Sequence, residues 1–184
     1  MYYKYTSFDY GWGCGWRTIQ NMVDKLFNIS TTIYEIMQTL TKKKFVFAED
    51  HYGFLDVEMA NSYFADFPVT VAQYNITNTC KLDQFINTMK NLDYTQTCIM
   101  MIHDGYIVMI NNFKNNKIEV IDPHQHYEID QFIELKKVGF GGIGWIDFTQ
   151  TIFENMSVLS ITNHDDFLQL NPPCFLVVAL NNTS

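Results

Sequence analysis

The chain has 184 residues, of which 47% are hydrophobic and 17% charged, a composition typical of a globular protein. This length suits one domain, and we expect residues 1–184 to form a single catalytic unit. The formal net charge of −8 argues against nucleic-acid binding, because a protein that binds phosphates needs a basic surface.

The sequence also argues against export and membrane insertion. Its longest apolar runs are far shorter than the ~20 residues that a helix needs to span a bilayer. The first residues lack the apolar segment of a secretory signal. The four cysteines form no C-x-x-C pair. We therefore expect a soluble protein of a reducing compartment, in particular the cytoplasm.

Apolar residues recur at helical spacing through the first half of the chain. One helix is expected to begin close to Cys14, a second at Thr32, which can form a capping box with Glu35, and a third after Asp56 as its N-cap. The apolar positions that predict these three helices and a fourth are Ile19, Met22, Val23, Leu26 and Phe27; Ile33, Ile36, Met37 and Leu40; Val57, Ala60, Phe64 and Phe67; and Leu82, Phe85, Ile86 and Met89.

Short apolar or β-branched runs in the second half predict strands. Asn115 and Asn116 suit the turn of a hairpin. The expected strands cover residues 68–76, 97–102, 105–113, 117–122 and 175–180. Helices followed by antiparallel strands indicate an α+β domain.

A cysteine lies within the run Gly11-Trp12-Gly13-Cys14-Gly15-Trp16-Arg17, near the start of the first expected helix. The free N–H groups and the dipole of a helix start favour a thiolate, which is the reactive form. The flanking glycines allow another backbone to approach the sulfur closely. A buried structural cysteine is the alternative, and the spacing alone leaves both interpretations open.

The second notable motif is Asp122-Pro123-His124 at the end of an expected strand. Residues two apart in a strand share a face, so the carboxylate should lie beside the imidazole, fix its tautomer and stabilise the imidazolium. His126 would share that face, and a metal site of Asp122, His124 and His126 is therefore the rival hypothesis. We favour a Cys–His–Asp site, which needs no metal or organic cofactor.

Both motifs resemble those of the ubiquitin-fold-modifier-specific proteases (the UfSP family). Members of that family carry a Gly-Trp-Gly-Cys-Gly/Ala-Tyr-Arg run and an Asp-Pro-His motif, although Trp16 replaces the usual tyrosine here. The segment from Gly139 to Trp145 is similar to a glycine- and tryptophan-rich segment of the family. The resemblance covers about residues 5–160 and implies a papain-like cysteine protease fold.

The resemblance also implies a role for individual residues. These are Cys14 as nucleophile, His124 as general acid and base, Asp122 as its orienting partner, Tyr5 (or, in second place, Tyr3) as oxyanion donor, and Trp12, Gly13 and Trp145 as substrate contacts.

The partner implied by the resemblance is a ubiquitin-fold modifier and its conjugates, cleaved after the modifier's C-terminal glycine. A narrow cleft lined by Gly11, Gly13 and Gly15 would suit such a tail. We expect a monomer. The alternatives are an autophagy-modifier protease or a ubiquitin-directed protease of the same superfamily, which share parts of these motifs. An inactive module that binds the modifier is an alternative of another class.

Overall fold

The chain forms an α+β fold around a six-stranded antiparallel sheet in the order β1-β6-β2-β3-β4-β5. A computed structural model describes residues 12–47, 53–103, 106–124, 142–153 and 163–181. The described helices are α1 (Cys14–Phe27), α2 (Ile33–Lys42), α3 (Val57–Phe64), α4 (Thr79–Lys90), α6 (Phe148–Phe153) and α7 (His164–Leu170). The strands are β1 (Val69–Asn75), β2 (Thr97–His103), β3 (Tyr106–Lys114), β4 (Lys117–Asp122), β5 (Gly142–Asp147) and β6 (Cys174–Leu180).

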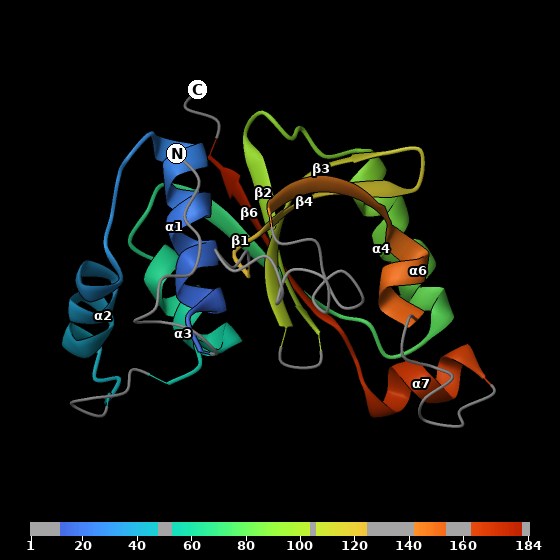
Figure 1. The fold of residues 1–184 in the computed structure, drawn as a ribbon, viewed down its shortest axis with the longest axis horizontal. Helices are drawn as coiled ribbons and strands as arrows, with labels where there is room; N and C mark the ends of the chain where they lie inside the picture. The colour runs from blue at the N-terminus through green and yellow to red at the C-terminus, as the bar shows by residue number, and fades with distance from the viewer. Residues whose placement is uncertain (1–11, 48–52, 104–105, 125–141, 154–162, 182–184) are drawn as a thin grey trace, which may run out of the picture.

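Helices cover both faces of the sheet. The helices α1, α2 and α3 lie on one face, and α4, α6 and α7 lie on the other (Figure 1). Alternate residues of one strand therefore enter different cores: in β2, Cys98 and Met100 face α1, whereas Ile99 and Met101 face α4. Burial on both faces explains why the central strands are continuous apolar runs rather than alternating ones.

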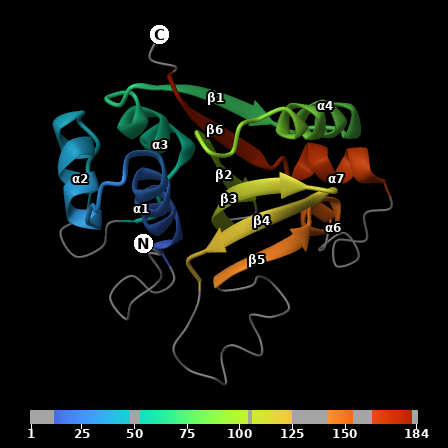
Figure 2. The same cartoon turned by 90° about the horizontal axis from the view of Figure 1, so that it is seen from above.

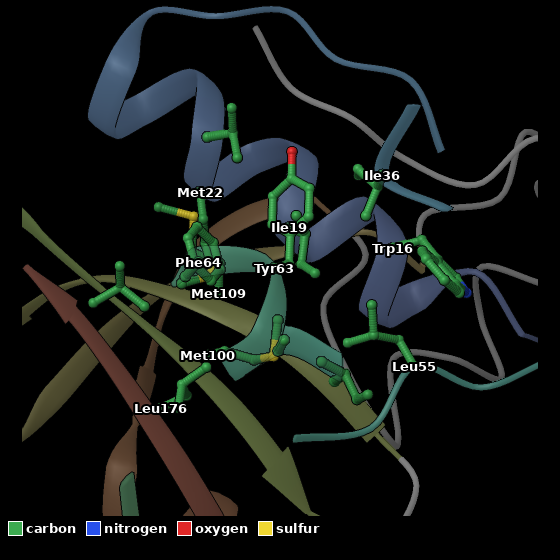
Figure 3. Packing of buried hydrophobic residues seen from close by; sticks show 14 of the residues in the cluster. Trp16, Ile19, Met22, Ile36, Leu55, Tyr63, Phe64, Met100, Met109 and Leu176 are labelled. Carbon is green, nitrogen blue, oxygen red and sulfur yellow. The ribbon is translucent and has the colours of Figure 1, made fainter. Parts of the chain in front are cut away.

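The expected helices of the first half are confirmed. The Thr32–Glu35 capping box begins α2, and the Asp56 side chain accepts a hydrogen bond from the Met59 N–H at the start of α3. Helix α1 turns a mainly apolar face toward the sheet, where Ile19 and Met22 pack among residues of α3 and of the strands (Figure 3).

The expected strands are also confirmed, and a hairpin joins β3 to β4 at Asn115 and Asn116, both of which have positive φ (53° and 59°). Three elements were not predicted, namely β5, α6 and α7. The two helices are 6 and 7 residues long, too short to show a helical period, and β5 contains two glycines. Within the described part of the chain, no helix is long and apolar enough to cross a membrane.

Candidate active site

Cys14 is the first residue of α1 and is almost fully buried, with 2% of its surface exposed. Gly13 precedes it as N-cap, with φ −80° and ψ −4°, and its carbonyl accepts the first helical hydrogen bond from the Arg17 N–H at 2.9 Å. Glycine has no side chain that could cap the helix, and no acidic residue lies in the first turn of α1. Cys14 therefore lies at the positive end of the helix dipole, a position that favours a thiolate.

Asp122 is the last residue of β4 and is 1% exposed. It lies on the buried face of the strand, together with Ile118 and Val120. Its Oδ1 atom is 2.5 Å from Nδ1 of His124 and also accepts a hydrogen bond from the His124 backbone N–H at 2.9 Å. A single carboxylate oxygen thus fixes both the backbone and the ring of the histidine.

His124 does not continue the strand, and the prediction that Asp122 and His124 share one face of an extended strand is wrong in this respect. The strand ends at Asp122, and Pro123 and His124 form a turn. An aspartate that accepts the N–H two residues further on makes a local turn of this kind, and proline supplies the restricted φ. The turn brings the imidazole back over the carboxylate.

The thiol and the imidazole meet just beyond the end of β4. Cys14 forms a side-chain hydrogen bond with His124, although the two residues lie far apart in the sequence. In Figure 2 the arrow of β4 is directed toward the beginning of α1, where Cys14 lies. The thiol, the imidazole and the carboxylate therefore form one hydrogen-bonded series.

The charges of this series support one another. Burial lowers the pKa of His124, but the hydrogen bonds and negative charges of Asp122 and Cys14 outweigh burial and raise it to about 9. Burial raises the pKa of Asp122, whereas the hydrogen bonds from His124 and Tyr106 and the charge of His124 lower it below its usual value. The arrangement thus favours an imidazolium between two anions at neutral pH.

Tyr106 is a site residue that the motifs did not reveal. Its hydroxyl donates a hydrogen bond to Oδ2 of Asp122, and its ring stacks on the imidazole of His124 with centroids 4.2 Å apart and planes 8° from parallel. The chain has 11 tyrosines, and nothing in the local sequence marks this one. Only the pairing of β3 with β4 could have placed it beside Asp122.

The residues expected to contact substrate lie in two places. Trp12 is 8% exposed, and Gly13 is buried, directly before Cys14. Trp145 is 42% exposed on β5, opposite Glu119 of the neighbouring β4. Tyr5 and the second-placed Tyr3 lie outside the described residues.

The expectation that Gly15 lines a substrate cleft is wrong. Gly15 faces the protein core, where a Cβ atom would lie 2.8 Å from Cβ of Leu55 and 3.1 Å from Cδ1 of Ile107. A glycine is required at this position because α1 packs closely on its neighbours. Gly11 lies outside the described residues. Of the three glycines expected to line the cleft, Gly13 is therefore the one described residue that can still do so.

The metal hypothesis gains nothing from the described residues. Among them no group of three histidine, cysteine, aspartate or glutamate side chains is close enough to hold a metal ion. His126, the third ligand in that hypothesis, lies outside the described part of the chain.

The fold is that of the papain-like cysteine proteases. The structure of UfSP from C. elegans is similar to this chain, with a TM-score of 0.59 and 14% sequence identity, and the match covers 98% of this chain and 32% of that one. This chain therefore spans about a third of the length of that protein. No protein-family model matches the sequence, and no curated protein matches it either.

Proposed function

We propose that the chain is a cysteine peptidase that cleaves after the C-terminal glycine of a ubiquitin-fold modifier. The observation that carries the proposal is the hydrogen-bonded series of Cys14, His124 and Asp122. A nucleophile, a base and a group that orients the base are the parts that acyl transfer requires.

In this mechanism the Cys14 thiolate attacks the carbonyl carbon of the terminal glycine. The His124 imidazolium then gives its proton to the leaving amine as the C–N bond breaks, and a thioester is left on Cys14. His124 next takes a proton from water, which attacks the thioester and releases the glycine carboxylate. Asp122 keeps the Nδ1 side of the ring occupied, so that the other nitrogen is directed to the reaction.

Charge also develops on the carbonyl oxygen. The backbone N–H of Cys14, at the start of α1, is suited to stabilise it, and Tyr5 is the side chain proposed to help. Trp12, Gly13 and Trp145 are the proposed substrate contacts. The leaving amine belongs either to a C-terminal peptide, in maturation, or to a lysine, in deconjugation.

Two observations support the modifier as substrate. The Gly-Trp-Gly-Cys and Asp-Pro-His motifs resemble those of the UfSP family, and a UfSP structure is similar in fold. A tail that ends in glycine also fits beside buried Trp12 and Gly13, because it carries no side chain at the cleaved bond. The monomeric state and the cytoplasmic location expected from the sequence remain predictions.

The test is a panel of modifiers that carry a C-terminal electrophile: the ubiquitin-fold modifier, ubiquitin and an autophagy modifier. We expect a covalent adduct with the first of these, on Cys14. Cys14→Ala should abolish the adduct, and Cys14→Ser should abolish peptide hydrolysis without loss of the fold. Cys80→Ser is the matched control, because Cys80 is exposed and lies on α4, away from the site.

The outcomes separate the alternatives. An adduct with ubiquitin or with the autophagy modifier alone would assign the site to one of the other substrates of the superfamily. Binding of a modifier without an adduct would indicate the inactive binding module. A Cys14→Ser variant that kept full hydrolysis would contradict the mechanism.

A further inference from the structure

Tyr106 contacts two members of the proposed catalytic series at once. It is the first residue of β3, donates a hydrogen bond to Asp122 and stacks on His124. We propose that Tyr106 is a positioning residue, which holds the Asp122 carboxylate ionised and keeps the His124 imidazole directed at Cys14. This inference rests on the proposed function, since it concerns the same site.

The first part of the argument is the distribution of donors around Asp122. Oδ1 accepts from the backbone N–H and the ring of His124, whereas Oδ2 accepts from the Tyr106 hydroxyl. A carboxylate that is 1% exposed keeps its charge only if hydrogen bonds replace the lost water. Tyr106 thus supplies a donor to the oxygen that His124 does not use.

The second part is the stacking. An imidazole can rotate about its Cβ–Cγ bond, and rotation would break the contact with Cys14. The Tyr106 ring lies 4.2 Å away and nearly parallel, at 8°, so it restricts this rotation. The face of an aromatic ring also attracts a cation, which favours the imidazolium form.

The third part is that Tyr106 itself is held in place. It pairs with His103 of β2, and the carbonyl of the next residue, Ile107, accepts a hydrogen bond from the Thr18 hydroxyl of α1 at 3.4 Å. The strand that carries Tyr106 is therefore bonded to the helix that carries Cys14. Tyr106 therefore lies on the strand that connects α1, which carries Cys14, with the His124–Asp122 pair at the end of β4.

The experiment measures the rate at which iodoacetamide alkylates Cys14 across a range of pH, read by mass spectrometry on the full chain. A small reagent is used because Cys14 is 2% exposed, and exposed Cys80 is the internal reference. The variants are Tyr106→Phe, which keeps the ring, and Tyr106→Leu, which removes it. Tyr94→Phe is the matched control, because this half-buried tyrosine donates to the Met89 carbonyl, outside the site.

We expect Tyr106→Phe to slow Cys14 alkylation at mildly acidic pH by about tenfold, the value of one hydrogen bond to a charged group. The acid limb of the profile should move to higher pH, because the pKa of Asp122 rises when a donor is lost. The groups that influence this profile are those around the pair. His124 and Tyr106 lower the pKa of Asp122, and Cys14 raises the pKa of His124. His103 is the titratable residue that pairs with Tyr106 across the strands. Tyr106→Leu should slow the reaction by about a hundredfold in total, and Tyr94→Phe should leave it unchanged.

A second series in the Asp122→Asn background separates positioning from a merely structural role. A residue that acts through Asp122 loses its effect there, so Tyr106→Phe should cause little further change. Two results would overturn the inference while leaving the peptidase proposal intact. One is the same tenfold loss of alkylation rate in both backgrounds. The other is a Tyr106→Phe variant whose alkylation rate and acid limb match those of the wild type. Wild-type Cys14 reacting no faster than Cys80 at acidic pH would instead contradict the peptidase proposal.

Discussion

The Asp122 carboxylate is buried, and both of its oxygen atoms accept hydrogen bonds. Burial of an isolated carboxylate is costly, and the cost falls when donors and an opposite charge surround it. At this site the donors come from β3 and from the turn after β4. The Asp122 carboxylate therefore stabilises both the local turn after β4 and the imidazolium of His124.

We expect Asp122→Asn to reduce kcat by about 10⁴-fold, because an amide cannot stabilise the imidazolium and favours the wrong tautomer. Hydrolysis of the modifier substrate found in the adduct panel provides the measurement. Asp93→Asn is the matched control, since Asp93 also accepts the N–H two residues further on, from Thr95, but is exposed and remote from Cys14. Equal kcat values for the two variants would argue against the role given to Asp122.

At this scale the sequence marked candidates whose motifs are local. The glycine-rich run made Cys14 a candidate, with a structural cysteine as the alternative, and a motif of adjacent residues made candidates of Asp122 and His124; the structure brings the three side chains together. Tyr106 could not be predicted, because its contacts depend on how β3 and β4 pair. Gly15 was misinterpreted for a related reason: its neighbour Leu55 is close only in the folded chain.

The site depends on the position of α1, because Cys14 is the first residue of this helix and has to lie within hydrogen-bond distance of His124. Gly15 sets how closely α1 approaches Leu55 and Ile107, and Trp16 fixes the same turn through a hydrogen bond from its Nε1 to the Gly53 carbonyl at 3.0 Å. The position of Cys14 is therefore set by the packing of the next two residues of the helix, Gly15 and Trp16.

We expect Gly15→Ala to lower the free energy of unfolding by about 1–2 kcal/mol, as overpacking outweighs the helix propensity gained. It should also slow Cys14 alkylation, because α1 has to shift. Denaturant titration and the iodoacetamide rate measure the two effects. Asn28→Ala is the control: Asn28 is the C-cap of α1 with φ 54°, at the opposite end of the helix from Cys14, so it should lose about 1 kcal/mol without a change in Cys14 reactivity.

Elements with a clear period were predictable, and short ones were not. Helix α1, with 14 residues, and α4, with 12, each present repeated apolar positions. Helices α6 and α7 contribute Phe148 and Phe167 to the second core, but each is too short for its spacing to identify it. Capping residues were the most reliable local signal, because a cap depends on contacts within one turn.

At the scale of the molecule, the site lies where one helical layer meets the end of a sheet strand. Cys14 belongs to the core on the α1 side, whereas Tyr106 packs against the core on the α4 side. The strand order that brings Cys14 and Tyr106 together depends on pairing between distant segments, and no local sequence pattern indicates it. A pattern of helices and strands predicted the α+β class, and the strand order required the structure.

The ionised pair makes the stability of the whole fold depend on pH. His124 has a pKa of about 9 when folded, against an ordinary value of 6.5, so its stabilisation is complete below about pH 6.5 and is lost as pH rises through 9. The pKa of Asp122 is lowered, so its contribution is lost as pH falls through that lowered value.

We therefore expect the difference in unfolding free energy between wild type and His124→Gln to decrease between about pH 6.5 and 9, by on the order of 2 kcal/mol. Urea titrations of both proteins at several pH values measure this difference. A difference that stayed constant over this range would contradict an imidazolium at the site.

The place of β6 has a consequence for the order of folding. This strand follows all the other described elements along the chain, yet it lies between β1 and β2 and contributes Leu176 to one core and Phe175 to the other. The β2-β3-β4 meander can form from neighbouring segments, whereas β1 has to wait for a partner about a hundred residues away, a slow closure. On the ribosome both cores thus stay open until residue 180 has emerged, and the approach of Cys14 to His124 is consolidated only at that late stage.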